Sequence, residues 1–523
     1  MTETRSTRTE TLALYGSLGI ASVAYRFPAL LNAATVDSDA AIVGIQARHM
    51  LRGELSWFLY GSGYQTSVDS AVAALFFAVL GATSLALMLS TLAGHIALTC
   101  CVHATLRPHL RPVHPWAAFV ATLPLVLTST PLHTYILNPP RQAALTLVFV
   151  AVLVIDRATG RASRRGRLGQ QAAGAALGGL ACFADPYALL FFPLLVLLGI
   201  ATAWDDAPSG REIRQSAGRV IATLVGAALG MLPLYALSHR PGAVHGETTL
   251  TLAVLSHNWA LLRDTCLPWL LGTTVFVPRA LLGYVPWPSG AILHGLALLG
   301  AALFLGAIAI GGGAVLRRDL PWSVRRLGGF GCAVGLATLA SFLVSVMVMD
   351  LFSSRYLAAL VLASPLALAP LASRVSPGRL ALLLAPYLAS AAVCGWLGYG
   401  DAVDGARVVS LPGHGAADEE RLGQLLRARG VRYAIADYWV SYRLTFLYAE
   451  QIAVVPIHER EDRYSPYRDG FRSASRSAYV FDPKRSREDL ASMEKSSFSG
   501  GDAWGRPVER LQVGPLTAII FER

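Results

Sequence analysis

Long apolar stretches separated by short polar loops fill the first 400 residues of the chain. Eleven such stretches can be delimited, at residues 11–33, 71–100, 116–137, 142–155, 170–184, 187–204, 220–238, 290–316, 328–349, 357–373 and 380–398. About 20 apolar residues in a helix span the hydrocarbon core of a bilayer. The pattern therefore predicts a polytopic α-helical membrane protein with about 11 transmembrane helices, the shortest of them between residues 142 and 204.

The pattern changes after residue 400. The stretch DEERLGQLLRARG predicts a helix that ends at a glycine, and SYRLTFLYAE predicts a second helix. Strands are predicted in VRYAIADYW, QIAVVPI, SAYVFD and LTAIIFE, where β-branched and aromatic residues gather between turn signals. We therefore expect a transmembrane unit at residues 1–400 and a C-terminal soluble α/β domain at residues 401–523.

Arginine residues are concentrated in five alternate loops of the apolar region, for example at 164–167 and 317–326. Because cytoplasmic loops are enriched in Lys and Arg, these loops predict an inner (plasma) membrane protein with a cytoplasmic N-terminus and an extracytoplasmic C-terminal domain. The formal net charge is +11, and residues 401–523 contribute nothing to it, with 18 basic and 18 acidic residues. We attribute the excess to membrane orientation and expect no nucleic-acid partner.

The first outer loop, residues 34–70, is rich in polar groups. Asp37 and Asp39 follow the first apolar stretch, and Asp69 precedes the second. Residues 40–52 have helical apolar spacing, which predicts a helix lying along the membrane surface. Capping of that helix is one explanation of the two aspartates. Other ionisable residues occupy further outer turns, and convergent charges at the ends of spans favour a functional site. These residues are Arg141, Asp185, Asp350 and Arg355.

A family resemblance rests on this loop. The order of an acidic pair, A-I-V-G-x-x-A-R-H-x-L-x-G-E, F-x-Y-G-x-x-Y and S-x-(acid) resembles the first outer loop of bacterial GT-C type membrane glycosyltransferases. These are relatives of the protein O-mannosyltransferases and of the aminoarabinose transferase that modifies lipid A. The Arg355-Tyr356-Leu357 step and the stretch ADYWVSYRLTFLYAE are also similar to members of this group.

The resemblance implies an inverting glycosyltransferase. Such enzymes pass a sugar from a polyprenyl-phosphate carrier to an acceptor, a protein, lipid or polysaccharide of the envelope, on the outer side of the membrane. Asp39 matches the first member of the family's acidic dipeptide, which implies that it is the base, with Asp37 as the second choice because Ala40 replaces the usual Glu. Asp69 stands where some relatives have a Glu that helps to hold a divalent metal. We expect no organic cofactor.

The departing phosphate of the carrier needs cations to hold its developing charge. Arg141 and Arg355 are the candidates for this role, together with Tyr356, and Arg48 and Arg263 are held in reserve. On the acceptor side the candidates are His49, Tyr60 and Tyr64. Each of these residue types is also common at membrane interfaces as an anchor, which is the alternative explanation for every one of them.

Two other functions stay open. A membrane transporter or lipid flippase is the first, although transporters place their charges near the bilayer midplane and often have internal symmetry, whereas the charges here lie at the ends of spans. A catalytically inactive GT-C relative acting in envelope assembly is the second, because Ala40 departs from the family's acidic pair. Convergence of Asp39, Asp69 and Arg355 on one cavity would favour the enzyme.

Overall fold

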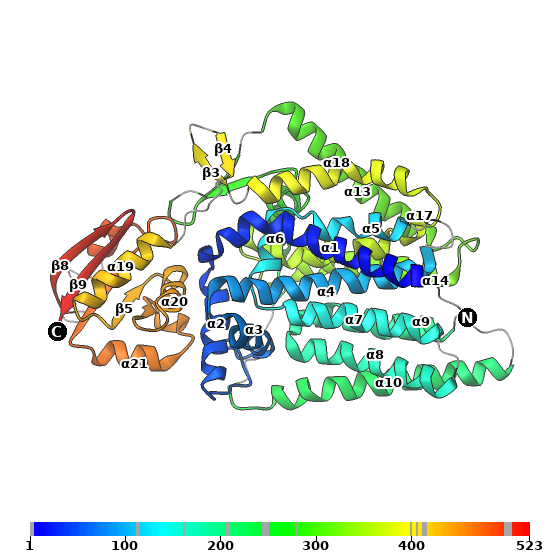
Figure 1. Ribbon diagram of the computed structural model, residues 1–523, viewed down its shortest axis with the longest axis horizontal. Helices are drawn as coiled ribbons and strands as arrows, with labels where there is room; N and C mark the ends of the chain where they lie inside the picture. The colour runs from blue at the N-terminus through cyan, green and yellow to red at the C-terminus, as the bar shows by residue number, and fades with distance from the viewer. Residues whose placement is uncertain are drawn as a thin grey trace.

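The computed structural model describes residues 5–110, 114, 116–160, 163–204, 210–242, 250–278, 280–287, 289–397, 400–403, 406–409, 416–495 and 505–523. An elongated helical bundle makes up most of the molecule, and a small α/β domain lies against one end of it (Figure 1). Helix α1 (Arg5–Leu31) begins at the end of the bundle that lies away from the α/β domain.

Six of the described helical segments are long and apolar enough to cross a membrane, and a seventh is obtained if one bent pair counts as a single span. They identify a multi-pass membrane protein, whereas the total of 11 spans stays a prediction. The six segments are α4 (Ser84–Leu110), Ser216–Ser238 within α10 (Gly210–Ser238), α13 (Ala291–Ala314), α14 (Trp322–Val344), Leu351–Ala372 and α18 (Pro377–Leu397).

Further helices complete the bundle. The bent pair consists of α5 (Ala117–Val126) and α6 (Thr130–Leu137), which meet at 84°. The others are α2 (Ser38–Leu51), α3 (Val68–Leu80), α7 (Gln142–Arg157), α8 (Arg164–Ala184), α9 (Phe192–Ala203), α11 (Leu252–Leu261), α12 (Leu267–Leu270), η5 (Leu351–Leu357), α15 (Ala358–Leu362), α16 (Ser364–Ala367) and α17 (Ala369–Ala372).

Besides the predicted span 116–137, which is bent between α5 and α6, two more predicted single spans are broken in the structure. The apolar stretch 71–100 is divided into α3 and α4 at Gly81, whose φ of +81° suits glycine because it has no Cβ. The stretch 357–373 is divided into short helical pieces, with Pro365 and Pro370 each at the start of one of them. Apolar composition alone reports such segments as continuous, which is why the sequence did not reveal the breaks.

The end of the bundle opposite the α/β domain is joined by one buried ionic network. The Asp156 carboxylate at the end of α7 accepts hydrogen bonds from the Arg326 guanidinium at 2.7 Å and pairs with the His109 ring at 2.9 Å. These residues come from the ends of α4, α7 and α14 that adjoin arginine-rich loops. The network therefore places three of the basic loops at one end of the bundle, as the alternation of loops predicts.

The α/β domain is built on a five-stranded sheet in the order β6-β5-β7-β9-β8. Strands β5 (Tyr433–Ala436), β6 (Ala453–Pro456) and β7 (Arg476–Phe481) are parallel, and β9 (Leu516–Glu522) and β8 (Arg506–Val513) are antiparallel to their neighbours. Its helices are α19 (Ala417–Ala428), α20 (Tyr438–Leu447), α21 (Ser465–Ser473) and α22 (Leu490–Met493). Two small hairpins lie elsewhere, β1 (Phe276–Pro278) with β2 (Tyr284–Pro286) and β3 (Gly400–Val403) with β4 (Ala406–Val409).

Helix α2 lies between the bundle and the α/β domain (Figure 1). Eleven of its 14 residues are buried, and in Figure 1 it runs across the long axis of the bundle helices, so its position along the membrane surface stays a prediction. Helix α20 covers one face of α2, with the Phe446 ring packed directly against Gly44. Helices α2 and α3 consequently share one apolar core with the sheet of the α/β domain, from Val36 to Phe521.

Candidate active site

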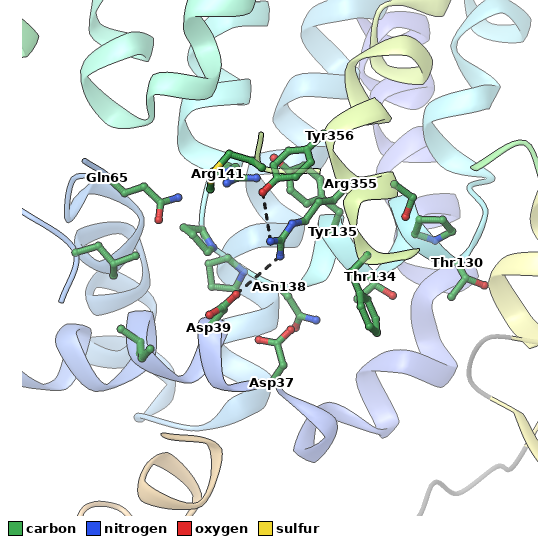
Figure 2. A pocket seen from close by; sticks show the side chains of 18 of the residues that line it. Asp37, Asp39, Gln65, Thr130, Thr134, Tyr135, Asn138, Arg141, Arg355 and Tyr356 are labelled. Carbon is green, nitrogen blue, oxygen red and sulfur yellow. Dashed lines mark hydrogen bonds and ion pairs between the residues drawn. The ribbon is translucent and has the colours of Figure 1, made fainter. Parts of the chain in front are cut away.

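A cavity of about 390 Å³ lies where the bundle, α2 and the α/β domain meet. Figure 2 shows Asp37 and Asp39 on one side of it and Arg355, Tyr356 and Arg141 on the other. Part of its wall is aromatic, formed by Trp269, Phe276, Tyr284 and Phe352, whose rings pack edge to face or tilted with centroids 5.1–6.4 Å apart. The cavity thus combines charged groups with an apolar surface, as sites for amphiphilic ligands do.

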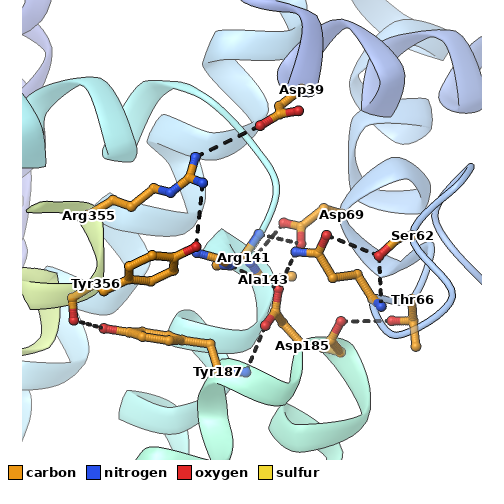
Figure 3. A network of polar contacts seen from close by, with 12 residues as sticks. Asp39, Ser62, Thr66, Asp69, Arg141, Ala143, Asp185, Tyr187, Arg355 and Tyr356 are labelled. Atoms are coloured by element: carbon orange, nitrogen blue, oxygen red, sulfur yellow. Dashed lines mark hydrogen bonds and ion pairs between the residues drawn. The ribbon is translucent and has the colours of Figure 1, made fainter. Parts of the chain in front are cut away.

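Asp39 lies in the first turn of α2 with its carboxylate 29% exposed to the cavity. Its Oδ2 is 3.8 Å from Nη1 of Arg355, and its Oδ1 accepts a hydrogen bond of 2.5 Å from the hydroxyl of Tyr438. The residue that the sequence predicted as the base and the cation predicted for phosphate therefore face each other in one cavity (Figures 2 and 3).

Asp37 is the N-cap of α2. Its Oδ1 accepts a 2.8 Å hydrogen bond from the backbone N–H of Ala40, so the capping explanation of this residue is correct. The side chain also lines the cavity. Burial, reinforced by the charge of the neighbouring Asp39 carboxylate, raises the pKa of Asp37 to about 6. Asp37 is therefore both the cap of α2 and a cavity residue with a raised pKa.

Arg355 and Tyr356 are presented by the short helix η5. The Asp350 carboxylate caps this helix by accepting the backbone N–H of Phe352 at 2.9 Å. The Arg355 side chain is 39% exposed, and its Nη2 lies 3.5 Å from the hydroxyl of Tyr356. The Tyr356 backbone oxygen in turn accepts a 3.1 Å hydrogen bond from Tyr187. The guanidinium of Arg355 is thus steered into the cavity but keeps most of its donors available to a ligand.

Arg141 lies in the cavity wall at the start of α7, with φ of +97°. Its guanidinium is 3.3 Å from Oδ2 of Asp185, which also accepts a 2.8 Å hydrogen bond from Gln65. The rings of Tyr187 and Tyr356 lie 5.7 and 5.3 Å from its guanidinium carbon. Because a carboxylate partly neutralises Arg141 and two rings hold it, its position is more constrained than that of Arg355 (Figure 3).

Asp69 lies behind this wall and serves the start of α7. Its two oxygens accept the backbone N–H groups of Arg141 at 2.9 Å and Ala143 at 3.0 Å, as a carboxylate at a helix N-terminus does. Within the described residues no three His, Cys, Asp or Glu side chains are grouped so that they could hold a metal ion. The surroundings of Asp69 therefore do not fit a protein-built metal site, and the divalent metal implied by the resemblance stays a prediction.

The remaining candidates separate into two groups. Tyr60 and Tyr64 line the cavity. His49 is 3% exposed and faces the α/β domain. Its Nε2 contacts Glu450 of that domain at 2.6 Å, and its Nδ1 contacts Tyr60 of the first outer loop at 2.9 Å. The two reserve cations also point elsewhere in the described structure: Arg48 donates to the backbone oxygens of Phe446 and Ala82, and Arg263 is exposed and paired with Asp264.

Two residues of the α/β domain reach the cavity region without having been predicted. Arg463 lines the cavity, and Tyr438 donates its hydroxyl to Asp39. Tyr438 follows strand β5 at the carboxyl end of a parallel sheet, where polar residues commonly form sites. The position of Tyr438 after the strand was the signal for a site residue in the sequence. It could not indicate the contact with Asp39 until the packing of α20 on α2 was known.

Comparison with known proteins identifies the fold of the chain. No family model and no curated protein sequence matches the chain. The structure of ArnT from Cupriavidus metallidurans in the apo state matches with a TM-score of 0.55 and 14% identity over 98% of both chains. The chain has the GT-C fold of ArnT. The resemblance predicted from the first outer loop is thereby confirmed at the level of the fold.

Two further solved structures match the chain. ArnT from the same organism bound to undecaprenyl phosphate has a TM-score of 0.56 and 13% identity, again over 98% of both chains. The apo oligosaccharyltransferase of Archaeoglobus fulgidus has a TM-score of 0.46 and 10% identity, over 90% of this chain and 69% of that one. The GT-C fold shared with ArnT includes the C-terminal domain, because the match covers nearly the whole chain.

Proposed function

We propose that this protein is an inverting glycosyltransferase that moves a sugar from a polyprenyl-phosphate carrier to an acceptor hydroxyl on the extracytoplasmic side of the membrane. The observation that carries the proposal is the approach of Asp39 and Arg355 across one cavity, with 3.8 Å between carboxylate and guanidinium. A base and a phosphate-binding cation on opposite elements are what a direct displacement at a sugar carbon needs.

Asp39 would act as the general base. An alcohol is a weak nucleophile near neutral pH and needs a positioned group to take its proton as the new bond forms. The Asp39 carboxylate is open to the cavity. Among the described contacts its Oδ2 accepts no hydrogen bond, and the Arg355 guanidinium lies 3.8 Å from it. Asp37 is the second choice, because one of its oxygens is already engaged in capping α2.

Arg355 would hold the leaving phosphate, assisted by Arg141 and Tyr356. A guanidinium can give two parallel hydrogen bonds to two phosphate oxygens, which fixes the direction in which the phosphate leaves. The two groups lie 3.8 Å apart, so bound substrates would have to separate them for the acceptor at Asp39 and the phosphate at Arg355 to lie on opposite sides of the anomeric carbon. That arrangement supports transfer in one step with inversion.

The donor class and the location have separate support. ArnT, whose fold the chain shares, has been solved with undecaprenyl phosphate bound, and the aromatic wall formed by Trp269, Phe276, Tyr284 and Phe352 is a suitable surface for an apolar carrier. The cavity lies at the end of the bundle opposite the Asp156 network, which joins the arginine-rich loops. If those loops are cytoplasmic, as their charge predicts, the cavity and the C-terminal domain are extracytoplasmic.

The test is a comparison of cell-envelope glycans by mass spectrometry. Cells with the gene, without it, and without it but carrying Asp39→Asn are compared. Asp264→Asn is the matched control, because that aspartate is exposed and, among the described residues, pairs only with Arg263. We expect one glycosylated envelope component to disappear on deletion, to stay absent with Asp39→Asn and to return with Asp264→Asn. Identical profiles with and without the gene would contradict the proposal.

A further inference from the structure

We infer that the α/β domain completes the active site, with Tyr438 as a positioning residue that holds the Asp39 carboxylate for proton transfer and Arg463 as the group that orients Tyr438. The inference rests on the proposed function for the meaning of Asp39 but on the structure alone for the contacts. It assigns to the C-terminal domain a direct part in the chemistry, beyond covering the cavity.

The first step concerns the two oxygens of Asp39. Oδ1 accepts the Tyr438 hydroxyl at 2.5 Å, whereas Oδ2 faces Arg355 at 3.8 Å, too far for a direct hydrogen bond. One oxygen is therefore anchored and the other is left to receive a proton. A hydrogen bond donated to a carboxylate also stabilises its charged form, which is the form that a base needs.

The second step concerns the direction of the tyrosine proton. The Nε–H of Arg463 donates to the Tyr438 oxygen at 3.3 Å, and its Nη1 donates to the backbone oxygen of Gly61 at 2.9 Å. A guanidinium has no acceptor, so Tyr438 can only accept from Arg463 and must direct its own proton elsewhere. Asp39 is the acceptor on the other side, and the chain Arg463–Tyr438–Asp39 therefore has one direction.

The third step concerns rigidity. The backbone oxygen of Tyr438 accepts a 2.6 Å hydrogen bond from the hydroxyl of Ser38, the residue directly before Asp39. The same hydroxyl accepts the backbone N–H of Arg443 at 3.3 Å, and the Arg443 guanidinium donates to the Ala34 oxygen at 2.8 Å. Two consecutive residues of α2 are thus bound by the first turn of α20, so the Tyr438–Asp39 contact does not depend on one side-chain rotamer.

The turn that receives Arg463 is built for a close approach. Gly61 has φ of +64°, and a Cβ at this position would come within 2.5 Å of Cδ of Arg463. A larger residue would therefore displace the arginine as well as strain the turn. The close approach at Gly61 thus joins the loop at 59–65 to the α/β domain. The same loop carries Tyr60 and Tyr64 in the cavity wall.

The test reads the protonation of Asp39 directly, so it does not require a known substrate. Carbodiimides modify protonated carboxyl groups, and dicyclohexylcarbodiimide is applied to the purified full-length protein over a range of pH. Peptide fragmentation in the mass spectrometer separates Asp39 from Asp37. The charged and titratable groups around Asp39 are Asp37 on its own helix, Arg355 on η5, Tyr438 on α20 and Arg463 behind it.

We expect Tyr438→Phe to extend Asp39 modification to higher pH, because one hydrogen bond to a charged group is lost. Tyr448→Phe is the matched control, since this tyrosine directly follows the same helix and its buried hydroxyl has no hydrogen-bond partner among the described residues. Arg463→Gln should shift the profile in the same direction as Tyr438→Phe. Product formation in the glycan assay should fall about ten-fold or more in Tyr438→Phe.

An Asp39 modification profile that is the same in Tyr438→Phe and wild type would overturn the inference, and so would equal shifts in Tyr438→Phe and Tyr448→Phe. A shifted profile in a protein without transferase activity would instead contradict the proposed function and leave the positioning role intact. If Tyr438→Phe unfolds, Arg463→Gln carries the same comparison, because the aromatic core contacts of Tyr438 are then preserved.

Discussion

The ring of His49 and the carboxylate of Glu450 lie 2.6 Å apart and join α2 to the end of α20. Glu450 also accepts the hydroxyl of Tyr467 at 2.6 Å and pairs with Arg52 at 3.2 Å. Since an ionised carboxylate can only accept, Nε2 of His49 carries the proton of this contact. The residue expected to bind substrate is thus part of the attachment between the first outer loop and the α/β domain.

The pH dependence of this attachment can be predicted. Burial raises the pKa of Glu450, but the hydrogen bonds from His49 and Tyr467 outweigh it and lower the pKa from 4.5 to about 2. A carboxyl whose pKa is lowered by folding stabilises the protein above its unfolded pKa, and this contribution is lost as the pH falls from about 4.5 to about 2. Glu450→Gln should therefore melt about 3 °C or more below wild type at pH 7.

The measurement is thermal unfolding of the detergent-solubilised protein by intrinsic fluorescence. The gap between wild type and Glu450→Gln should narrow as the pH is lowered through this range. Glu459→Gln is the control, because Glu459 is an exposed residue of the same domain paired with Arg472. A gap that stays constant from pH 7 to pH 3 would argue against the assigned role of the carboxylate.

Asp39→Asn should abolish sugar transfer while insertion and folding are retained. Loss of a general base typically lowers the rate by two to four orders of magnitude, roughly 100- to 10,000-fold. The assay is formation of the glycosylated envelope component in isolated membranes. Near wild-type product in this variant would remove Asp39 as the base, and Asp37→Asn should then be the damaging substitution.

Asp37→Asn should be well tolerated by the fold, because Asn caps helices about as well as Asp. The folded pKa of Asp37, about 6, lies above its ordinary value of 3.8, so its ionisation opposes folding increasingly as the pH rises through this interval. The Asn variant should lack this dependence and melt at or above the wild-type temperature at pH 7. Asp37→Ala, which loses the cap, should be less stable by about 1 kcal/mol.

Arg355→Lys should weaken binding of undecaprenyl phosphate about ten-fold, and Arg355→Ala should weaken it further. A lysine keeps the charge but loses the paired donors that fit two phosphate oxygens. Binding of radiolabelled undecaprenyl phosphate to the purified protein measures the effect. Arg263→Ala is the control, since Arg263 is exposed and paired with Asp264. If Lys at 355 binds as well as wild type, Arg355 is only an interfacial anchor.

A reporter enzyme fused after Arg523 should be active only if it folds outside the cytoplasm. The reason is the side assigned to the α/β domain by the arginine-rich loops. Fusions of alkaline phosphatase and of a cytoplasmic fluorescent protein give opposite readings and control for expression. Fluorescence together with an inactive phosphatase would reverse the orientation and place the cavity on the cytoplasmic side.

The parts that the sequence predicted correctly are those determined by local pattern. Helix α20 and strand β9 follow from the local apolar pattern, and Asp39 and Arg355, which were singled out in two separate outer segments, line one cavity. Strand β8 was missed because it is an edge strand in which five of eight residues are exposed, and such strands carry little apolar alternation.

The errors concern contacts between distant segments. Helix α2 has the composition of an interfacial helix, and only the packing of Phe446 on Gly44 shows that its outer face is covered. The same packing brings Tyr438 to Asp39, so the burial of α2 and the contact made by Tyr438 were missed for one physical reason. The contact between His49 and Glu450 was missed for the same reason, since Glu450 comes from the segment that covers α2.

The shared core of α2, α3 and the sheet has a consequence for how the protein is made. Ser38 and its partner Tyr438 are 400 residues apart in the chain. At about 5–20 residues per second, the ribosome delivers α20 roughly 20–80 s after the first outer loop. During that interval the apolar face of α2 has no covering helix, and the pair Asp39–Tyr438 does not exist. The interface between α2 and the α/β domain therefore forms only near the end of synthesis, and a chain truncated before α20 would be inserted without it.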